Sequence, residues 1–154
     1  MSTIKKFLNL IFIDGLSGMA LGLFSTLIIG TILKQIADLI GGDFGYYLGV
    51  FAVIAQRLTG AGIGIGVAYK YKSSTYVTLS AAAAGMIGAY ATTIISGSIL
   101  SDGALVYSGP GDPLSAFIAA LAGIAIGSLP AGKTKLDLLI TPAVTIITGG
   151  ATGI

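Results

Sequence analysis

The stretch GSLPAGKT, residues 127–134, matches the phosphate-binding pattern G-x-x-x-x-G-K-[ST] at every required position. In proteins that use this pattern, a buried strand enters the loop, a helix leaves it, and backbone N–H groups and the lysine hold the phosphates. Here the preceding residues are rich in alanine and glycine with helical spacing, and Pro142 follows too soon for a regular helix after the loop. We therefore expect a connecting loop rather than a nucleotide site, with Lys133 and Lys135 in it.

A second glycine-rich stretch, GAGIGIG at residues 60–66, also fails as a nucleotide-binding motif. Its glycines stand two apart throughout, whereas the dinucleotide-binding pattern G-x-G-x-x-G contains one wider gap. Each glycine in a helix costs about 1 kcal/mol relative to alanine. The stretch is therefore predicted to break or distort a helix, which a membrane tolerates only where protein or a water-filled cavity covers the backbone.

Arg57 stands directly before this run, in AQRLTGAG, near the middle of an apolar segment. A guanidinium at the centre of a bilayer costs on the order of 3 kcal/mol, so the charge needs a reason. Either Arg57 snorkels or neutralises an aspartate such as Asp14, or it binds a solute. If Arg57 binds a solute, Gln56 and Thr59 would orient that solute, and Gly60 would let the backbone approach it.

Two aspartates are weaker candidates for contact with such a solute. Asp14 lies at the start of the first apolar segment, in IDGLSG, where it could cap a helix N-terminus. Asp112 directly precedes Pro113, and an acidic residue followed by proline is an ordinary helix start. We expect both to be caps, with solute contact as the alternative. Residues 109–112 could also belong to a re-entrant loop.

Composition excludes most catalytic chemistry. The 154 residues include no cysteine, histidine or glutamate, so zinc, haem and Ser-His-Asp sites lack the residues that carry them. We predict no catalytic, metal or cofactor site. A net charge of +2 from scattered residues gives no electrostatic footprint for nucleic acid. With 55% hydrophobic and only 9% charged residues, the chain is typical of a membrane protein.

Five apolar segments meet or approach the roughly 20 residues that a membrane-spanning helix needs. They cover residues 16–33, 46–69, 76–100, 114–131 and 136–154. A short interfacial stretch around residues 5–12 precedes the first. The predicted fold is all-α: a polytopic membrane helix bundle of about five spans, with a broken or glycine-distorted second helix.

Basic and acidic residues alternate between the connections of this bundle. The lysines that flank the first, second and fourth segments on one side are Lys5, Lys6, Lys70, Lys72, Lys133 and Lys135. The other connections carry Asp38 and Asp43 with one lysine, and Asp102 and Asp112 without one. Since lysine in short loops marks the cytoplasmic side, we expect a cytoplasmic N-terminus and a multi-pass topology.

Small residues recur at every fourth position in three of the segments. These stripes are Gly18, Gly22, Thr26 and Gly30; Ser80, Ala84, Gly88, Thr92 and Ser96; and Ser115, Ala119, Gly123, Gly127 and Ala131. Small residues let helix backbones approach closely in lipid, where the hydrophobic effect does not draw helices together. We interpret the stripes as packing surfaces rather than as the lining of a ligand site.

Four strings now indicate a family. IDGLSGMALGLFSTLIIGTIL, LTGAGIGIGVAY, GPGDP and AGKTKLDLLITPAVTIITGG, in this order, resemble the N-terminal half of the enzyme IIC-like membrane proteins of the bacterial phosphotransferase system. That group includes sugar-permease subunits and membrane regulators, and the resemblance covers nearly the whole chain. It implies a permease component in the bacterial inner membrane, a small polar solute such as a sugar, and cytoplasmic phosphotransferase subunits as partners. Family members are longer, so residues 1–154 are expected to be one membrane domain from the N-terminal part of a longer permease.

The leading hypothesis is therefore a solute-transport component embedded in membrane lipid, with its solute near Arg57. A non-transporting membrane sensor that binds a small ligand and signals through the basic loops is the alternative, and a purely structural segment that forms oligomers is a third. An odd number of segments and an apolar C-terminal stretch indicate either a fragment of a longer membrane protein or a half that completes itself by pairing, so a homo-oligomer is also expected.

Overall fold

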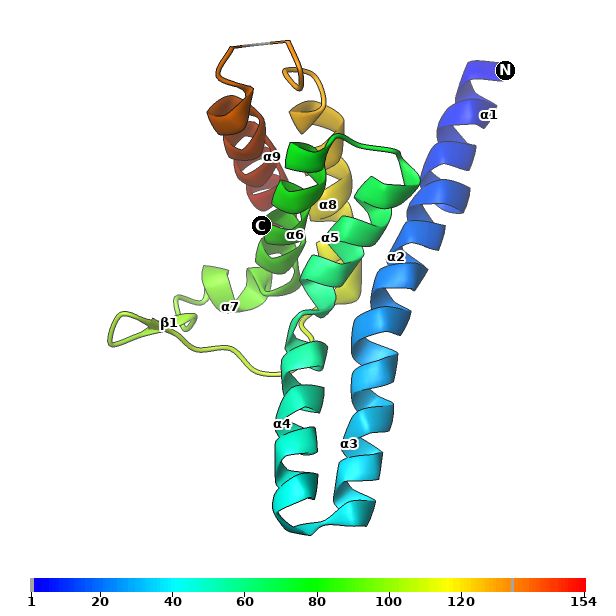
Figure 1. The fold of residues 1–154 in the computed structure, drawn as a ribbon. Coiled ribbons are helices and arrows are strands. Elements are labelled where there is room, and N and C mark those ends of the chain that lie inside the picture. Colours follow the sequence, from blue (N-terminus) through cyan, green and yellow to red (C-terminus); the bar gives the residue numbers. More distant parts are fainter. Residues whose placement is uncertain (1, 134) are drawn as a thin grey trace.

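The computed structural model describes residues 2–133 and 135–154, and most of these are helical. The chain begins with one continuous helix of 39 residues, Ser2–Ile40. Its parts are α1 (Ser2–Asn9), a π-helical stretch (Leu10–Gly15), α2 (Leu16–Leu23), a second π-helical stretch (Phe24–Ile28) and α3 (Ile29–Ile40). The predicted interfacial stretch and first segment are thus parts of a single helix (Figure 1).

The chain then reverses into a long helical hairpin and bends. Gly41 and Gly42 make the reversal with φ of 65° and 63°, a region that glycine enters without steric cost. α4 (Gly42–Arg57) runs back along α3, and α5 (Thr59–Lys70) leaves it at an angle of 54°. The predicted break in the second helix is confirmed, but it lies at Leu58. The glycine run itself is helical, so its predicted distortion was wrong.

The remaining elements are shorter than the sequence predicts. They are α6 (Thr75–Ala89), α7 (Ala91–Ile95), β1 (Leu100–Ser101), β2 (Ala104–Leu105), α8 (Pro113–Gly127) and α9 (Asp137–Gly153). β1 and β2 form a small antiparallel hairpin in which Leu100 pairs with Leu105. The third predicted segment, residues 76–100, is therefore wrong as one helix, because α6 ends at Ala89. α9 confirms a helix in the fifth predicted segment, and Pro142 lies inside it, so only the expectation that proline leaves little room for a helix after the loop was wrong.

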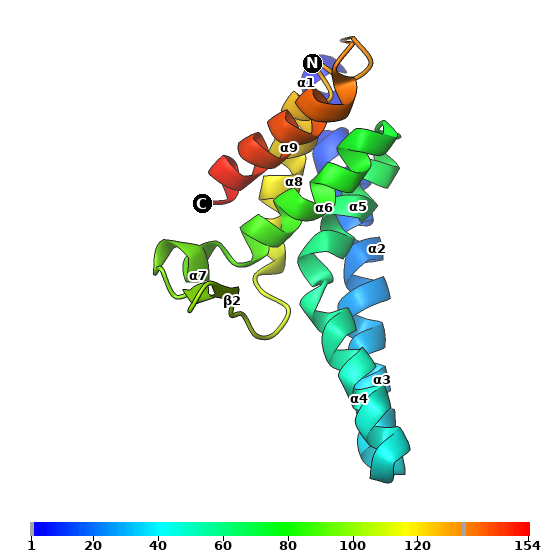
Figure 2. The same cartoon turned by 60° about the vertical axis from the view of Figure 1, so that its left-hand side comes forward.

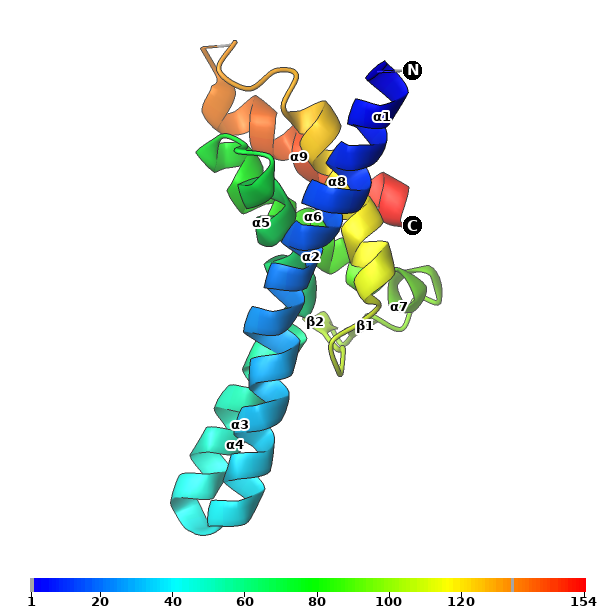
Figure 3. The same ribbon diagram turned by 90° about the vertical axis from the view of Figure 1, so that its right-hand side faces the viewer.

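Five helices form a body from which the α3–α4 hairpin extends (Figure 2). α2, α5, α6, α8 and α9 lie side by side, and the core residues come mainly from α5, α6 and α8. The N-terminus, the α5–α6 turn and the α8–α9 connection share one end of this body, which we call the lysine end (Figures 1 and 3). The tip of the α3–α4 hairpin lies at the opposite end of the molecule.

Glycine forms the contacts between these helices, as the small-residue stripes predict. A Cβ placed on Gly64 would stand 2.0 Å from the carbonyl oxygen of Ala81, and one on Gly22 would stand 2.3 Å from that of Gly62. A Cβ on Gly123 of α8 would likewise stand 2.7 Å from the carbonyl oxygen of Thr145 of α9. Backbones therefore touch directly, and the packing interpretation is confirmed.

Much of the outer surface is apolar. Large hydrophobic side chains are exposed along the whole of the first helix and α4, among them Phe12, Phe24, Ile32, Phe44 and Phe51. Exposed apolar surface on this scale marks a membrane or a partner. Among the described helices, Ser2–Ile40 is long and apolar enough to cross a membrane, and the bent α4–α5 pair passes the same test together, whereas α6 and α8 are apolar but shorter. Five separate crossings therefore stay a prediction.

The described part of the motif GSLPAGKT, residues 127–133, lacks the strand and the free backbone N–H groups of a phosphate-binding loop. Gly127 is the last residue of α8, so a helix enters the loop where a nucleotide site needs a strand. The backbone N–H of Gly132 is already occupied, because it donates to Asp137 Oδ1 at 3.0 Å. Thr134, the final position of the motif, lies outside the described residues. The prediction of a connecting loop is confirmed for the described part.

Gly64→Ala tests whether backbone contact holds the body together. Its added methyl would overlap the α6 backbone, so we expect a loss of about 1–3 kcal/mol in the free energy of unfolding, measured on the purified protein in detergent. Gly49→Ala is the matched control, because a Cβ there meets nothing closer than 3.8 Å. The control should be neutral or stabilising by up to about 1 kcal/mol. Equal effects of the two substitutions would contradict the packing account.

Candidate functional site

The bend between α4 and α5 is fixed by local hydrogen bonds. Leu58 adopts φ −85° and ψ 8°, outside regular helix, and its N–H is shared between the carbonyls of Ile54 and Ala55 at 3.2 Å each. The Thr59 hydroxyl donates to the carbonyl of Gln56 at 2.6 Å. A side chain that binds a backbone carbonyl in this way is a common cause of a helix kink.

Contacts with different neighbouring helices hold α4 and α5 in different directions. On the α4 side, Gln56 Nε2 donates to Thr31 Oγ1 at 3.1 Å and so ties α4 to α3. On the α5 side, Thr59 is buried, and Gly60 is so close to α6 that a Cβ would stand 2.7 Å from the carbonyl oxygen of Gly85. Three of the predicted site residues, Gln56, Thr59 and Gly60, thus make contacts between helices that position Arg57.

Arg57 lies at the vertex of the bend, beside a loop that the sequence did not connect with it. Its guanidinium carbon is 5.9 Å from the centroid of the Tyr107 ring, within the range of a cation–π contact. The Tyr107 ring in turn packs on Tyr90, with centroids 4.6 Å apart. Tyr90 Oη donates to Gly109 O at 2.5 Å and has Arg57 O as a second acceptor at 3.3 Å.

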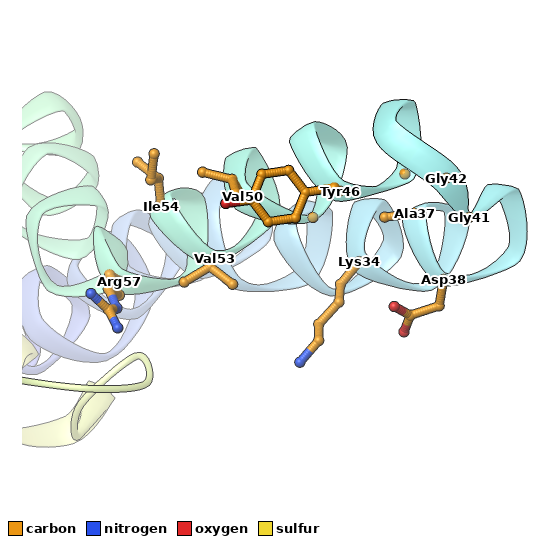
Figure 4. A pocket seen from close by; sticks show the side chains of 12 residues that line it. Lys34, Ala37, Asp38, Gly41, Gly42, Tyr46, Val50, Val53, Ile54 and Arg57 are labelled. Carbon is orange, nitrogen blue, oxygen red and sulfur yellow. The ribbon is translucent and has the colours of Figure 1, made fainter.

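A cavity of about 670 Å³ extends from Arg57 along the α3–α4 hairpin. Its polar lining consists of Lys34 and Asp38 from α3 and Tyr46 and Arg57 from α4, and the rest is aliphatic or glycine. Lys34, Asp38 and Arg57 project on the same side of the hairpin (Figure 4). Both signs of charge and an aromatic ring thus line the same cavity.

Asp112 caps α8, as its position before Pro113 predicts. Its Oδ1 accepts from the Leu114 N–H at 3.0 Å, and its Oδ2 accepts from the Ser115 hydroxyl. Its own N–H donates to Ala89 O at 2.7 Å, which fixes the loop to the end of α6. The Ser115 bond, with the backbone bonds, lowers the pKa of the Asp112 carboxyl below its usual value despite some desolvation. The carboxylate is therefore used in the cap.

Asp14 is neither a cap nor a neighbour of Arg57. It lies within a π-helical stretch of the continuous first helix, so no helix begins there, and the predicted capping role was wrong. Asp14 is near Tyr71 at the lysine end; burial first, and the charge of Asp14 second, raise the pKa of the Tyr71 hydroxyl. The hypothesis that Asp14 neutralises Arg57 thereby loses its geometric basis.

Sequence reasoning missed the residues that complete the surroundings of Arg57. Lys34 and Asp38 stand four apart on a helix, which indicates a shared face but not the α4 residues opposite it. Nothing in the sequence indicates that Tyr90 and Tyr107 meet across the loop. Among the described residues, no three metal-binding side chains of the His, Cys, Asp or Glu type come together.

Comparison with known proteins gives one match. A family model described as "Phosphotransferase system, EIIC" matches residues 13–154, nearly the whole chain. No curated protein and no solved structure matches it. The family resemblance carried by the four sequence strings is confirmed.

Asp112→Ala tests the cap on which the loop beside Arg57 depends. Loss of an N-cap costs about 1 kcal/mol of stability near neutral pH. Since the folded-state pKa of Asp112 is lowered, the charged cap stabilises above the unfolded pKa of about 4 and its contribution is lost as the pH falls through the folded-state value. Unfolding at pH 7, 5 and 3 should show the gap between wild type and variant closing only at the lowest pH. Asp102→Asn, which changes an exposed aspartate elsewhere, controls for net charge and should not alter the free energy of unfolding. If it does not, an undiminished stability difference between wild type and Asp112→Ala at pH 3 contradicts the cap assignment.

Proposed function

The chain belongs to the EIIC family of the phosphotransferase system, and on this premise we propose that it is a membrane component of a sugar permease. Its apolar surface supports insertion in the lipid of a bacterial inner membrane. We propose transport rather than a non-transporting sensor, because the matched family is that of the transport system. The cytoplasmic phosphorylating subunits of that system are the proposed partners.

The dimensions of the body support a membrane-spanning placement. Near the lysine end, Tyr71 Oη donates to Leu10 O at 2.9 Å, and at the bend Gln56 meets Thr31. The helix between Leu10 and Thr31 is about 30 Å long, the thickness of a bilayer's hydrocarbon core. We therefore propose that the first helix crosses the membrane, with α5, α6, α8 and α9, each shorter than a full span, packed beside it as further membrane segments.

The distribution of lysines supports an orientation for this body. Lys5 and Lys6 lie in α1, Lys70 and Lys72 at the α5–α6 turn, and Lys133 in the α8–α9 connection. These three segments meet at the lysine end (Figure 3). Short connections rich in lysine face the cytoplasm, so the N-terminus is cytoplasmic and Arg57 lies near the external boundary. The apolar α3–α4 hairpin then extends outward, where we propose that a second copy of the chain covers part of it.

The cavity at Arg57 is the observation that carries the solute assignment. Binding sites for small molecules are concave and mainly apolar, with a few polar groups that fix the orientation of the ligand. Arg57 would donate to hydroxyl oxygens of a sugar at the bend, while Lys34, Asp38 and Tyr46 line the part of the cavity nearer the tip of the hairpin. Gln56, Thr59 and Gly60 hold the bend, and Asp112 holds the adjoining loop.

Transport with Arg57→Ala tests the site. Hydrogen bonds to charged groups contribute about 1.5–3 kcal/mol, so we expect binding to weaken by about tenfold or more. A panel of monosaccharides and hexitols is first screened for thermal stabilisation of the purified protein, and the stabilising compound is then used for uptake into liposomes. Lys133→Ala, at the opposite end, is the control and should retain uptake. Undiminished binding and uptake by the Arg57→Ala protein would exclude this site.

Cysteine labelling tests the orientation. The chain has no native cysteine, so Ser73→Cys and Ser108→Cys each introduce a single thiol. In intact cells, a membrane-impermeant maleimide should label position 108 from outside and position 73 only after permeabilisation. Labelling of both positions from the same side would refute the orientation.

A further inference from the structure

A second cavity, of about 750 Å³, lies at the lysine end and plays no part in the proposed solute site. Three segments surround it: the first helix, the turn from α5 to α6, and α8 with the residues after it. Its lining is Phe7, Leu10, Ile11, Lys70, Tyr71, Lys72, Ser73, Ser74, Leu121, Ala122, Ile124, Ala125, Ser128 and Ala131. Cationic and hydroxyl groups come from the turn, and nearly all other lining atoms belong to apolar side chains.

The turn that supplies the charges has an unusual residue at its key position. Lys72 N–H donates to Tyr69 O at 3.1 Å and Ser73 N–H donates to Ala68 O at 3.0 Å, the two hydrogen bonds of a Schellman motif. The residue at the position of Lys72 must be left-handed, and glycine is usual there because it has no Cβ. Lys72 holds φ 52°. The backbone would be less strained with glycine, so a lysine at this position points to a role for its side chain.

The walls of the cavity suit a hydrocarbon chain. Leu10 and Ile11 of the first helix and Leu121 and Ala125 of α8 line it. Tyr71 also lines the cavity, and its hydroxyl donates to Leu10 O, which links the turn to the first helix. Exposed Lys70 and Lys72 remain at the rim, next to apolar walls. A ligand that fits must combine an anionic head with an apolar tail.

We propose that this cavity binds an anionic phospholipid from the leaflet at the lysine end. The phosphate group would lie between Lys70 and Lys72, with the Ser73 hydroxyl nearby, and one acyl chain would run between the first helix and α8. The volume is in the range of small-molecule sites, so it holds the head group and the upper part of a chain rather than a whole lipid. Basic pockets between helices on the cytoplasmic side are the recognised form of such sites.

The strained lysine allows an experiment that separates binding from folding. Lys72→Gly removes the charge and at the same time relaxes the backbone, so the variant should melt at the same or a higher temperature than wild type in lipid-free detergent. Binding of phosphatidylglycerol to the delipidated protein is measured by native mass spectrometry, with phosphatidylcholine as the neutral reference. Because one lysine near an anionic lipid is worth about 1 kcal/mol, Lys72→Gly should weaken phosphatidylglycerol binding about fivefold, and Lys70→Gln with Lys72→Gln about 25-fold. Phosphatidylcholine binding should not change.

Two matched variants separate the effect of charge from those of backbone strain and cavity shape. Asp102 has φ 51°, so Asp102→Gly relaxes the same backbone conformation far from the cavity and should leave lipid binding unchanged. Ala125→Phe places bulk in the apolar part without altering charge and should also weaken phosphatidylglycerol binding.

The proposal is overturned if Lys72→Gly keeps the wild-type preference for phosphatidylglycerol. It is also overturned if inorganic phosphate displaces the lipid while Ala125→Phe has no effect, because the site would then take a soluble anion. The assay runs in detergent without transported solute, so it can fail or succeed whatever uptake and orientation show.

Discussion

Direct contact between helix backbones determines how this molecule is built. Within lipid the hydrophobic effect does not draw helices together, so association depends on close van der Waals contact. Glycine provides that contact at the crossings of α5 with α2 and of α5 with α6, where a single methyl group would overlap a carbonyl oxygen. α5 therefore lies at the centre of the body, although its glycines make it a poor helix in isolation. The same residues that weaken the helix locally determine its neighbours.

The position of Arg57 follows from these contacts. α5 is drawn toward α6 by the approach of Gly60 to Gly85, while α4 is tied to α3 through Gln56 and Thr31. A straight helix cannot satisfy both sets of contacts, and the chain bends between them at Leu58. Arg57 is the last residue of α4 before the bend, so its side chain faces the cavity along the hairpin and the loop that contains Tyr107. The polar site is a consequence of packing between apolar helices.

The sequence was sufficient for features that depend on short range. The small-residue stripes, the cap formed by Asp112 and the loop at residues 128–133 all follow from local patterns. Hydropathy was insufficient for helix ends. The third apolar run continues beyond Ala89, where α6 stops. The first apolar run begins only after Asp14, which already lies inside a helix. Helix propensity put the break in the glycine run, whereas tertiary contacts kept that run helical and moved the break to Leu58. The charged lining of the Arg57 cavity required the reversal at Gly41 and Gly42, which brings residues of two helices together.

The position of Arg57 at one end of the body explains why its guanidinium needs no ion pair among the described residues. An arginine at the bilayer centre needs a partner, and the sequence suggested Asp14. Along the first helix, however, the contact of Gln56 with Thr31 lies about 30 Å from Leu10, so the membrane placement that we propose has Arg57 at a boundary rather than at the centre. There, water and the face of Tyr107 can stabilise the guanidinium without an ion pair. Its charge is then free to meet an uncharged, hydroxyl-rich ligand, which could not compete with a bound carboxylate.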